Sequence, residues 1–376
     1  MIAGGGTGGH VYPGIAIYNA LRRAGGPVEV LFVGAKAGVE SRIFEELNLP
    51  YILLSGRGVR GSSLLRKLAS PFLLAAGIVA GIRAVASFNP DVVIGTGGYA
   101  SVATVAAAVV CRRRRVLQEQ NSVPGMANRV LSRFAHLVLL SYQESRVFFG
   151  GLKRYAVVGN PLRVEPGGDR AAALRFFGLR GDLSTVLVFG GSRGAQSINA
   201  AARSAVRAIL KGRDVQFVLL TGEADFEAVS RDLADVGDYV RVYPFLNEIQ
   251  HAYNAADIAV SRAGASAVFE LAAFGVPAVF IPYPYAADDH QQRNVATLEN
   301  MGAAVVIDNE TLDGKGLETI ILSLLDDGER RAGMSARLRE WSRAGAADLA
   351  ARHVIDVVES RRQEQRVVLR PRGVRG

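Results

Sequence analysis

The sequence predicts an α/β protein built from two halves, each rich in strand–helix–strand units. Short apolar runs of strand length alternate with helix-like segments, a pattern typical of parallel sheets. Glycine-rich turns follow several of these strands and open the next helix. A polar, glycine-rich stretch at 165–170 indicates a linker, after which the pattern restarts with a strand over 185–189.

Length and composition agree with this class. A chain of 376 residues is too long for one core and suits two domains. Apolar residues make up 49% of the chain, which indicates packed domains rather than disorder. The single cysteine, Cys111, excludes an internal disulfide and a cysteine-based zinc site, and fits a reducing compartment. The opening residues do not resemble a signal peptide.

The net charge of +9 comes mainly from arginine and favours phosphate-rich partners. Nucleic acid, an anionic membrane and a diphosphate substrate are the three candidates. Nucleic acid is the weakest, because no zinc-finger, RNA-recognition or helix-turn-helix signature is present and aromatic residues do not interleave with the basic ones.

The first glycine turn, GGGTGGH at 4–10, follows a short strand and opens a helix over 11–21 with Pro13 in its first turn. Its glycines satisfy the G-x-G-x-x-G spacing of dinucleotide sites. That fingerprint also requires an acidic residue at the end of the next strand, and the stretch 28–36 has none at its end. This argues against a nicotinamide cofactor.

His10 ends this turn, where the positive end of a helix dipole disfavours an imidazolium. We therefore expect a neutral His10 that can accept a proton, the alternative being a capping or packing histidine. A second candidate base is Glu119, within the polar run QEQNSVPG at 118–125 that follows a strand. Polar residues so dense at a strand end are costly unless they bind something.

Residues 64–85 form the most apolar stretch, but its uncharged part, 68–82, is too short to span a bilayer and contains Pro71. Basic residues flank this stretch: Arg57, Arg60, Arg66, Lys67 and Arg83. We expect an interfacial element with apolar side chains among acyl chains and cations on anionic headgroups. A buried helix of an ordinary α/β domain is the alternative. In the first interpretation, the four-arginine turn at 112–115 extends the basic patch.

Three further turns fit the same scheme. TGGY at 96–99 follows a strand and opens a helix over 101–110. GNPLR at 159–163 is a turn made rigid by proline, and GGSRGA at 190–195 opens a helix over 197–210. Because ligands of open α/β sheets bind at the carboxyl ends of the strands, we expect a site in a cleft between the two halves.

The stretch 261–294 carries the most informative pattern. A strand over 256–260, a small-residue turn at 262–266, a helix and a strand over 276–281 make a βαβ crossover. Unpaired N–H groups and the helix dipole make the turn an anion site. Glu270 lies one turn further, which suits a nucleotide with its diphosphate on the helix tip and its ribose on the glutamate. A surface helix with one exposed glutamate is the alternative.

The motifs together resemble those of the MurG family of peptidoglycan N-acetylglucosaminyltransferases. They are GGGTGGHVYPGIAIYNAL, GTGGYAS, QEQNSVPGMANR, VVGNPLR, VFGGSRGAQSIN and SRAGASAVFELAAFGVPAVFIPYPYAADDHQQRNV, in the expected order over about residues 2–343. The resemblance implies a GT-B fold, with two Rossmann-like domains whose parallel sheets face a deep cleft. It implies an acceptor- and membrane-binding domain at 1–163, onto which a helix at 346–360 packs back. It further implies a UDP-N-acetylglucosamine domain at 164–340, and we expect a disordered basic tail at 361–376.

The resemblance also implies site residues. Donor binding falls to Thr7, Gly8, Gly9, Asn121, Arg163, Ser192, Leu246, Gly264, Ala265, Ser266, Ala267, Val268, Phe269, Glu270, Gln291 and Gln292. Within this set, Glu270 takes the ribose, residues 265–267 take the diphosphate, Leu246 takes the uracil through its backbone, and the two glutamines hold the sugar. The residues implied to bind the acceptor are Gly97, Gly98, Tyr99 and Asn128.

The implied reaction is an inverting transfer from UDP-N-acetylglucosamine to the muramoyl 4-hydroxyl of undecaprenyl-diphospho-muramoyl-pentapeptide (lipid I), which gives β-1,4-linked lipid II. His10 takes the proton, with Glu119 as the other candidate, and Arg163 helps to offset charge on UDP. No metal and no cofactor is expected. The implied location is the cytoplasmic face of the bacterial cell membrane, with other cell-wall and division proteins left open as partners.

Two departures from the family pattern stand out. Family members often carry His where Gln118 stands, and polar, Leu or Thr residues at Ser266 and Ala267, so backbone N–H groups must dominate diphosphate binding. Three rival functions remain: a nicotinamide-dependent oxidoreductase, a UDP-sugar epimerase of the same fold, and a non-catalytic membrane-surface module.

Overall fold

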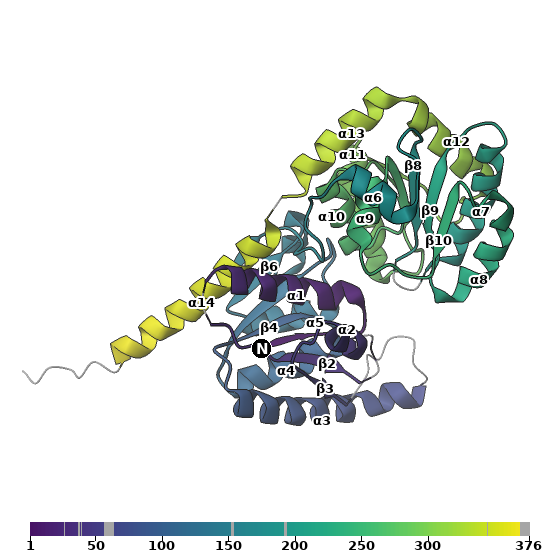
Figure 1. Cartoon of the computed structure of the whole chain (residues 1–376). Helices are drawn as coiled ribbons and strands as arrows, with labels where there is room; N and C mark the ends of the chain where they lie inside the picture. Colours follow the sequence, from purple (N-terminus) through teal and green to yellow (C-terminus); the bar gives the residue numbers. More distant parts are fainter. Residues whose placement is uncertain are drawn as a thin grey trace, which may run out of the picture. The chain divides into compact units, whose positions relative to one another are not determined.

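The computed structural model describes residues 1–25, 27–36, 38, 40–55, 64–151, 154–191, 194–343 and 345–368, with the backbone alone at 64–71, 287 and 361–368. The chain divides into two compact units. Unit 1 comprises Met1–Arg163 and Gly345–Gly376, and unit 2 comprises Val164–Ala344. Each unit is an α/β domain with one parallel sheet covered by helices (Figure 1), which confirms the predicted fold class.

Unit 1 contains a seven-stranded sheet in the order β3-β2-β1-β4-β5-β6-β7. Its strands are β1 (Ile2–Gly4), β2 (Phe32–Ala35), β3 (Tyr51–Leu54), β4 (Val92–Gly97), β5 (Arg114–Glu119), β6 (Leu137–Leu140) and β7 (Tyr155–Val157). The strands pair in parallel, and the order reverses between β1 and β4, as in a Rossmann fold. The register of this pair, Ile2 with Ile94, brings the turns after both strands to the same edge of the sheet.

The main helices of unit 1 are α1 (Gly8–Arg23), α2 (Glu40–Glu46), α3 (Leu64–Phe88), α4 (Gly98–Val110), α5 (Met126–Leu131) and α14 (Ala346–Val368). The last helix lies along α1 (Figure 1). Ala347 and Ala351 of α14 are buried against Ala16 and Ala20 of α1, and these small side chains allow the two backbones to approach closely.

The expected disordered tail at 361–376 requires a correction. Helix α14 continues to Val368, because the run RRQEQRVV consists mostly of residues that favour helix even without an apolar repeat. The remaining part of that tail, 369–376, lies outside the described residues.

Unit 2 contains a six-stranded parallel sheet in the order β10-β9-β8-β11-β12-β13, which repeats the Rossmann order. Its strands are β8 (Thr185–Phe189), β9 (Gln216–Leu220), β10 (Val240–Tyr243), β11 (Ile258–Ser261), β12 (Ala278–Phe280) and β13 (Ala304–Val306). Its main helices are α6 (Arg170–Phe177), α7 (Gln196–Leu210), α8 (Glu223–Asp232), α9 (Ile249–Ala255), α10 (Ala265–Phe274), α11 (His290–Asn300), α12 (Gly314–Asp326) and α13 (Gly328–Trp341).

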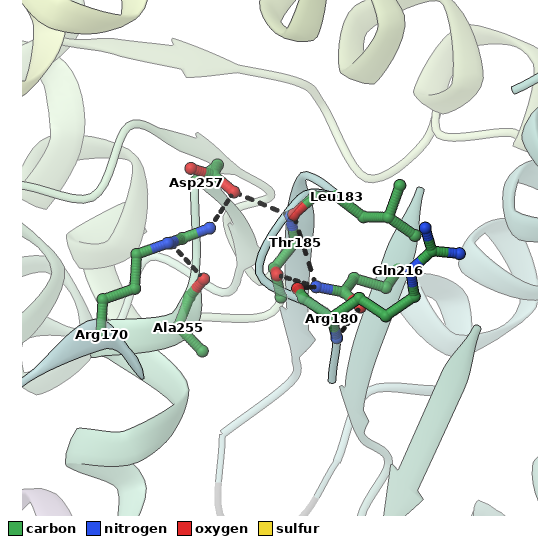
Figure 2. A network of polar contacts seen from close by, with 7 residues as sticks. All are labelled: Arg170, Arg180, Leu183, Thr185, Gln216, Ala255 and Asp257. Carbon is green, nitrogen blue, oxygen red and sulfur yellow. Dashed lines mark hydrogen bonds and ion pairs between the residues drawn. The ribbon is translucent and has the colours of Figure 1, made fainter. Parts of the chain in front are cut away.

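A polar network closes the amino edge of the second sheet (Figure 2). Asp257, just before β11, accepts hydrogen bonds from Arg170 at 2.7 Å and from the backbone N–H of Thr185 at 2.8 Å. The amide of Gln216 donates to the Thr185 hydroxyl at 2.9 Å and accepts from the backbone N–H of Arg180 at 3.0 Å. These bonds satisfy polar groups at the starts of β8 and β9, so the opposite, carboxyl edge is the one left for ligands.

Candidate functional site

Each unit brings glycine turns to the point where its strand order reverses. In unit 1 these turns follow β1 and β4, and in unit 2 they follow β8 and β11. Ligands of open α/β sheets bind at the carboxyl ends of the strands beside such a reversal. Each unit therefore has its own candidate site.

In unit 2, the tip of α10 is built to receive an anion. The N-cap residue is Gly264, which has no side chain that could cap the helix. The N–H of Val268 donates to the Gly264 carbonyl at 3.0 Å, so the regular helical bonds begin there. Helix geometry leaves the N–H groups of Ala265, Ser266 and Ala267 without an acceptor inside the helix, and the dipole adds positive potential at the same point.

Glu270 lies one turn behind this tip. Its side chain is only 6% exposed, and Oε2 accepts a hydrogen bond from the Tyr253 hydroxyl at 2.6 Å. Tyr253 belongs to α9 and is itself buried, so it fixes the direction of the carboxylate. The sequence offered no local signal for this partner, because 17 residues and a change of element separate the two side chains.

Val268 and Phe269 lie in the core rather than at the tip. Val268 is fully buried, and Phe269 packs on Trp341 with ring centroids 4.6 Å apart. Their side chains therefore hold α10 in place, and the expected donor contacts of both residues stay predictions. Leu246, in the loop after β10, has a buried side chain, and its backbone contact with the uracil stays a prediction.

Arg262 connects several turns of unit 2 by hydrogen bonds. No pattern in the sequence indicates this role. Its guanidinium donates to the Ile281 carbonyl at 3.1 Å, to Asn309 at 2.8 Å and to the Ser197 hydroxyl at 2.9 Å. Burial lowers the pKa of Arg262, although the bonds keep the cation well satisfied. Arg262 thereby joins the turn before α10 to the end of β12 and to the start of α7.

Helix α11 carries the two expected sugar-binding amides. Gln291 accepts a hydrogen bond from the backbone N–H of Tyr283 at 2.9 Å, whereas Gln292 is exposed. The buried Asn294 donates to the Ala263 carbonyl at 3.1 Å, which ties α11 to the turn before α10. Ser192, expected to touch the donor, lies outside the described residues.

In unit 1, the turns after β1 and β4 are packed together. A side chain on Gly98 would overlap the Gly5 carbonyl oxygen, and one on Gly97 would lie 2.9 Å from Nε2 of His10. Both glycines also have positive φ values, 79° and 113°, which favour glycine. The Thr96 hydroxyl donates to the His10 carbonyl at 2.6 Å. The tip of α4 is therefore held beside His10.

The hydrogen bonds of His10 define its tautomer. Nδ1 lies 3.0 Å from the Gly5 carbonyl oxygen and 3.5 Å from the Thr7 hydroxyl. A carbonyl can only accept, so Nδ1 carries the hydrogen in this bond. The neutral ring then has its lone pair on Nε2, the nitrogen that lies toward Gly97. This arrangement suits a proton acceptor.

Glu119 has a different environment. It is 2% exposed, and its two oxygens accept bonds from the backbone N–H groups of Asn121 and Gly125 and from the side-chain amides of Asn121 and Asn128. Burial raises the pKa of Glu119, and these hydrogen bonds oppose that effect. A carboxylate so enclosed holds the loop after β5 in shape, so the geometry favours His10 over Glu119 as the base.

The remaining residues expected in unit 1 serve partly as internal supports. The Tyr99 hydroxyl donates to the Leu73 carbonyl at 2.7 Å, and burial raises the pKa of Tyr99. Asn128 is buried beside Glu119, and Arg163 lies over the Tyr12 ring at 4.5 Å. At the tip of α4, the backbone of residues 97–99 is thus the part suited to a ligand.

Gln118, which stands where family members often carry histidine, is fully buried. Its amide donates to the Ser141 hydroxyl at 3.1 Å and to Asn160 at 3.4 Å. It therefore holds neighbouring strands and loops together and is not placed to act on a substrate. Across the parts of the chain that the structure describes, no group of three or more His, Cys, Asp or Glu side chains is arranged to hold a metal ion.

Comparisons with known proteins agree with this picture. Residues 1–140 match the glycosyltransferase family 28 N-terminal domain, and residues 185–352 match the corresponding C-terminal domain. A Chlorobaculum parvum protein named UDP-N-acetylglucosamine–N-acetylmuramyl-(pentapeptide) pyrophosphoryl-undecaprenol N-acetylglucosamine transferase is 43% identical over 94% of this chain and 97% of its own length. The chain belongs to the MurG family. The Syntrophus aciditrophicus protein of the same name is 39% identical over 88% of this chain and 92% of its own.

Solved structures place this MurG family member among GT-B proteins. The crystal structure of Acinetobacter baumannii MurG matches with a TM-score of 0.73 and 28% identity, over 96% of this chain and 98% of that chain. A putative UDP-N-acetylglucosamine 2-epimerase from Listeria monocytogenes matches with a TM-score of 0.70 and 15% identity, over 96% of both chains, a likeness of fold alone. The predicted GT-B fold and the resemblance to the MurG family are both confirmed.

Proposed function

We propose that this protein transfers N-acetylglucosamine from UDP-N-acetylglucosamine to the muramoyl 4-hydroxyl of undecaprenyl-diphospho-muramoyl-pentapeptide, forming the β-1,4 link of lipid II. The observation that carries this proposal is the similarity, over nearly the whole chain, to proteins named for that transfer. The two family 28 domains support the same glycosyltransferase class.

Donor binding falls to unit 2 in this proposal. The diphosphate lies on the N–H groups at the tip of α10, where charge and hydrogen-bond donors coincide. Glu270, already oriented by Tyr253, accepts hydrogen bonds from the ribose hydroxyls. Gln291 and Gln292 at the start of α11 contact the sugar. The backbone at Leu246 flanks the uracil, and Ser192 stays a predicted contact.

Catalysis falls to His10 of unit 1. In an inverting transfer, the 4-hydroxyl attacks the anomeric carbon as UDP leaves, and Nε2 of His10 takes the hydroxyl proton. The tip of α4, at Gly97 and Gly98, offers N–H groups to the acceptor diphosphate. Positioning of both sugars supplies much of the rate. The expected donor contacts of Thr7, Gly8, Gly9, Asn121 and Arg163 remain predictions.

Helix α3 is the part of unit 1 proposed to meet the membrane on its cytoplasmic face. Phe72 is 80% exposed and Val79 is 51% exposed, and seven residues make about two helical turns, so both lie on one face. No helix is long and apolar enough to cross a membrane in the portion that the structure describes. An exposed apolar stripe followed by Arg83 suits insertion among headgroups. The flanking arginines at 57 and 60 lie outside the described residues.

The transfer itself is tested with labelled UDP-N-acetylglucosamine and a lipid I analogue. We expect a labelled glycolipid that forms only when both substrates are present. Label that changes sugar identity without an acceptor would favour an epimerase instead. Binding of NADH but not of UDP would favour an oxidoreductase. Binding to vesicles without any sugar transfer would favour a non-catalytic membrane-surface module.

The donor site is tested by Glu270→Gln, which keeps an oxygen for Tyr253 but removes the charge. We expect the dissociation constant for UDP-N-acetylglucosamine to rise by roughly 10- to 150-fold, the loss typical of a hydrogen bond to a charged group. Titration calorimetry measures this change. Glu299→Gln, an exposed change in the same unit, serves as the control. Unchanged donor affinity in Glu270→Gln would remove Glu270 from the site.

The base is tested by His10→Ala. Turnover should fall by roughly 10²- to 10⁴-fold because a general base is lost, while the KM for the donor changes little. Steady-state kinetics with the lipid I analogue give both constants. His353→Ala, on α14 of the same unit, should be close to wild type. Near-normal turnover in His10→Ala would assign the proton to solvent or to Glu119.

The membrane surface is tested by Phe72→Asp and Val79→Asp, measured by co-sedimentation with vesicles that contain anionic lipid. Each change should weaken binding by about tenfold, because an exposed apolar side chain proposed to enter the lipid is replaced by a negative charge that the anionic headgroups repel. Met301→Asp, an exposed apolar position in unit 2, is the matched control. Equal binding by all variants would move the membrane contact away from α3.

A further inference from the structure

A buried carboxylate lies inside the first glycine turn. Glu40 is the first residue of α2 and is fully buried. Its Oε1 accepts a hydrogen bond from the backbone N–H of Ala35 at 2.9 Å, and both of its oxygens lie 3.1 Å from the backbone nitrogen of Gly6. The carboxylate thus occupies a place where a Rossmann turn ordinarily receives a ligand phosphate.

The Gly5–Gly6 peptide joins this carboxylate to His10. The N–H of Gly6 donates to Glu40, and the carbonyl of Gly5, in the same peptide unit, accepts from Nδ1 of His10 at 3.0 Å. A peptide unit is planar, so its two ends move together. Hydrogen bonds in series also polarise one another, so a negative charge at one end strengthens the acceptor at the other.

The turn is shaped around this connection. A side chain at Gly5 would overlap Oε1 of Glu40, and one at Gly34 would overlap its methylene groups. Gly6 has a φ of +90°, a backbone conformation that favours glycine. The glycines around the turn therefore leave space for an internal carboxylate. This explains their presence without dinucleotide binding.

We propose that Glu40 is a positioning residue for His10: through the Gly5–Gly6 peptide it fixes the ring with Nε2 as acceptor and makes Nε2 a stronger base. This inference rests on the proposed role of His10 as the base. In other enzymes a carboxylate hydrogen-bonded directly to a catalytic imidazole fixes the tautomer and orientation of the ring. Here Glu40 does the same through one intervening peptide unit.

Tyr12 and Arg163 lie near the first turn of α1, and Tyr99 lies at the tip of α4 beside that turn. Glu119 ends β5, and Asp348 belongs to α14, which packs along α1. The Tyr99 hydroxyl donates a hydrogen bond to the Leu73 carbonyl, and Glu119 accepts hydrogen bonds from its own loop. Asp348 forms a salt bridge with Arg23 in the last turn of α1. Glu40, by contrast, is connected to the His10 ring through the Gly5–Gly6 peptide.

The test is a titration of the histidines by NMR in wild type and in Glu40→Gln. Removing the negative charge disfavours the imidazolium, so the His10 midpoint should fall. Coulomb's law gives a shift of about 0.4–1.5 pH units for charges roughly 8 Å apart at an effective dielectric of 80 to 20. The other four of the five histidines should not move, and His10→Gln identifies the His10 signal.

Kinetics supply a second readout. In Glu40→Gln the acidic limb of the kcat/KM profile should move to lower pH by the same amount, and kcat should fall roughly tenfold with little change in the KM for the donor. Glu46→Gln removes the same charge from an exposed position on α2 and is the matched control. Glu40→Asp keeps the charge but draws the carboxylate back by one methylene group, so its His10 midpoint should lie between those of wild type and Glu40→Gln. If Glu40→Gln does not fold, this smaller fall in Glu40→Asp is the result that tests the proposal.

An unchanged His10 midpoint in a folded Glu40→Gln protein would overturn the proposal, as would an equal shift in Glu46→Gln. The titration needs no activity, so it is readable even if His10→Ala proves as active as wild type. That second result would overturn the proposed base and, with it, the catalytic meaning of the Glu40 connection.

Discussion

Backbone N–H groups at the carboxyl edge of a parallel sheet are the feature on which both sites depend. A glycine turn that opens a helix leaves several of these donors without an acceptor, and something negative must satisfy them. At α10 the N-cap residue is Gly264, which has no side chain to cap the helix, and this suits the donors to a ligand. At the first turn of unit 1, Glu40 takes the Gly6 N–H from within the chain. The same local geometry thus suits ligand binding at α10 and internal support at the first turn of unit 1.

The two units share one strand order and differ in what their turns carry. In unit 1 the turn after β1 ends in His10, whose ring is held by the Gly5 carbonyl. In unit 2 the turn after β11 carries small residues, and Glu270 follows one turn later on the same helix. In the proposed function, the proton acceptor thus belongs to unit 1 and nucleotide recognition to unit 2. Arg262 and Asn294 of unit 2 stabilise loops, as Glu119 does in unit 1.

Features set by neighbouring residues could be predicted from the sequence, whereas distant partners could not. The turn before α10 and the place of Glu270 follow from spacing within one helix. Tyr253 and Glu40 reach their partners across 17 and 34 residues, and no periodicity connects those positions. No acidic residue stands at the end of β2 in the sequence, and Glu40, from the start of α2, turns back to the N–H of Ala35 there. Val268 and Phe269 matched the family motif, yet their burial follows from packing within unit 2.

The first glycine turn shows why spacing alone is weak evidence for a dinucleotide. A pyrophosphate on this turn needs the N–H of Gly6, but that donor already lies 3.1 Å from a buried carboxylate. Bringing two anions to one donor in a buried setting costs free energy, since like charges repel strongly where water is excluded. A phosphate there would have to displace Glu40 and leave its charge unsatisfied. The glycine motif therefore predicts a tight turn at a strand end, and the neighbouring acid decides whether the turn binds a ligand or holds the histidine.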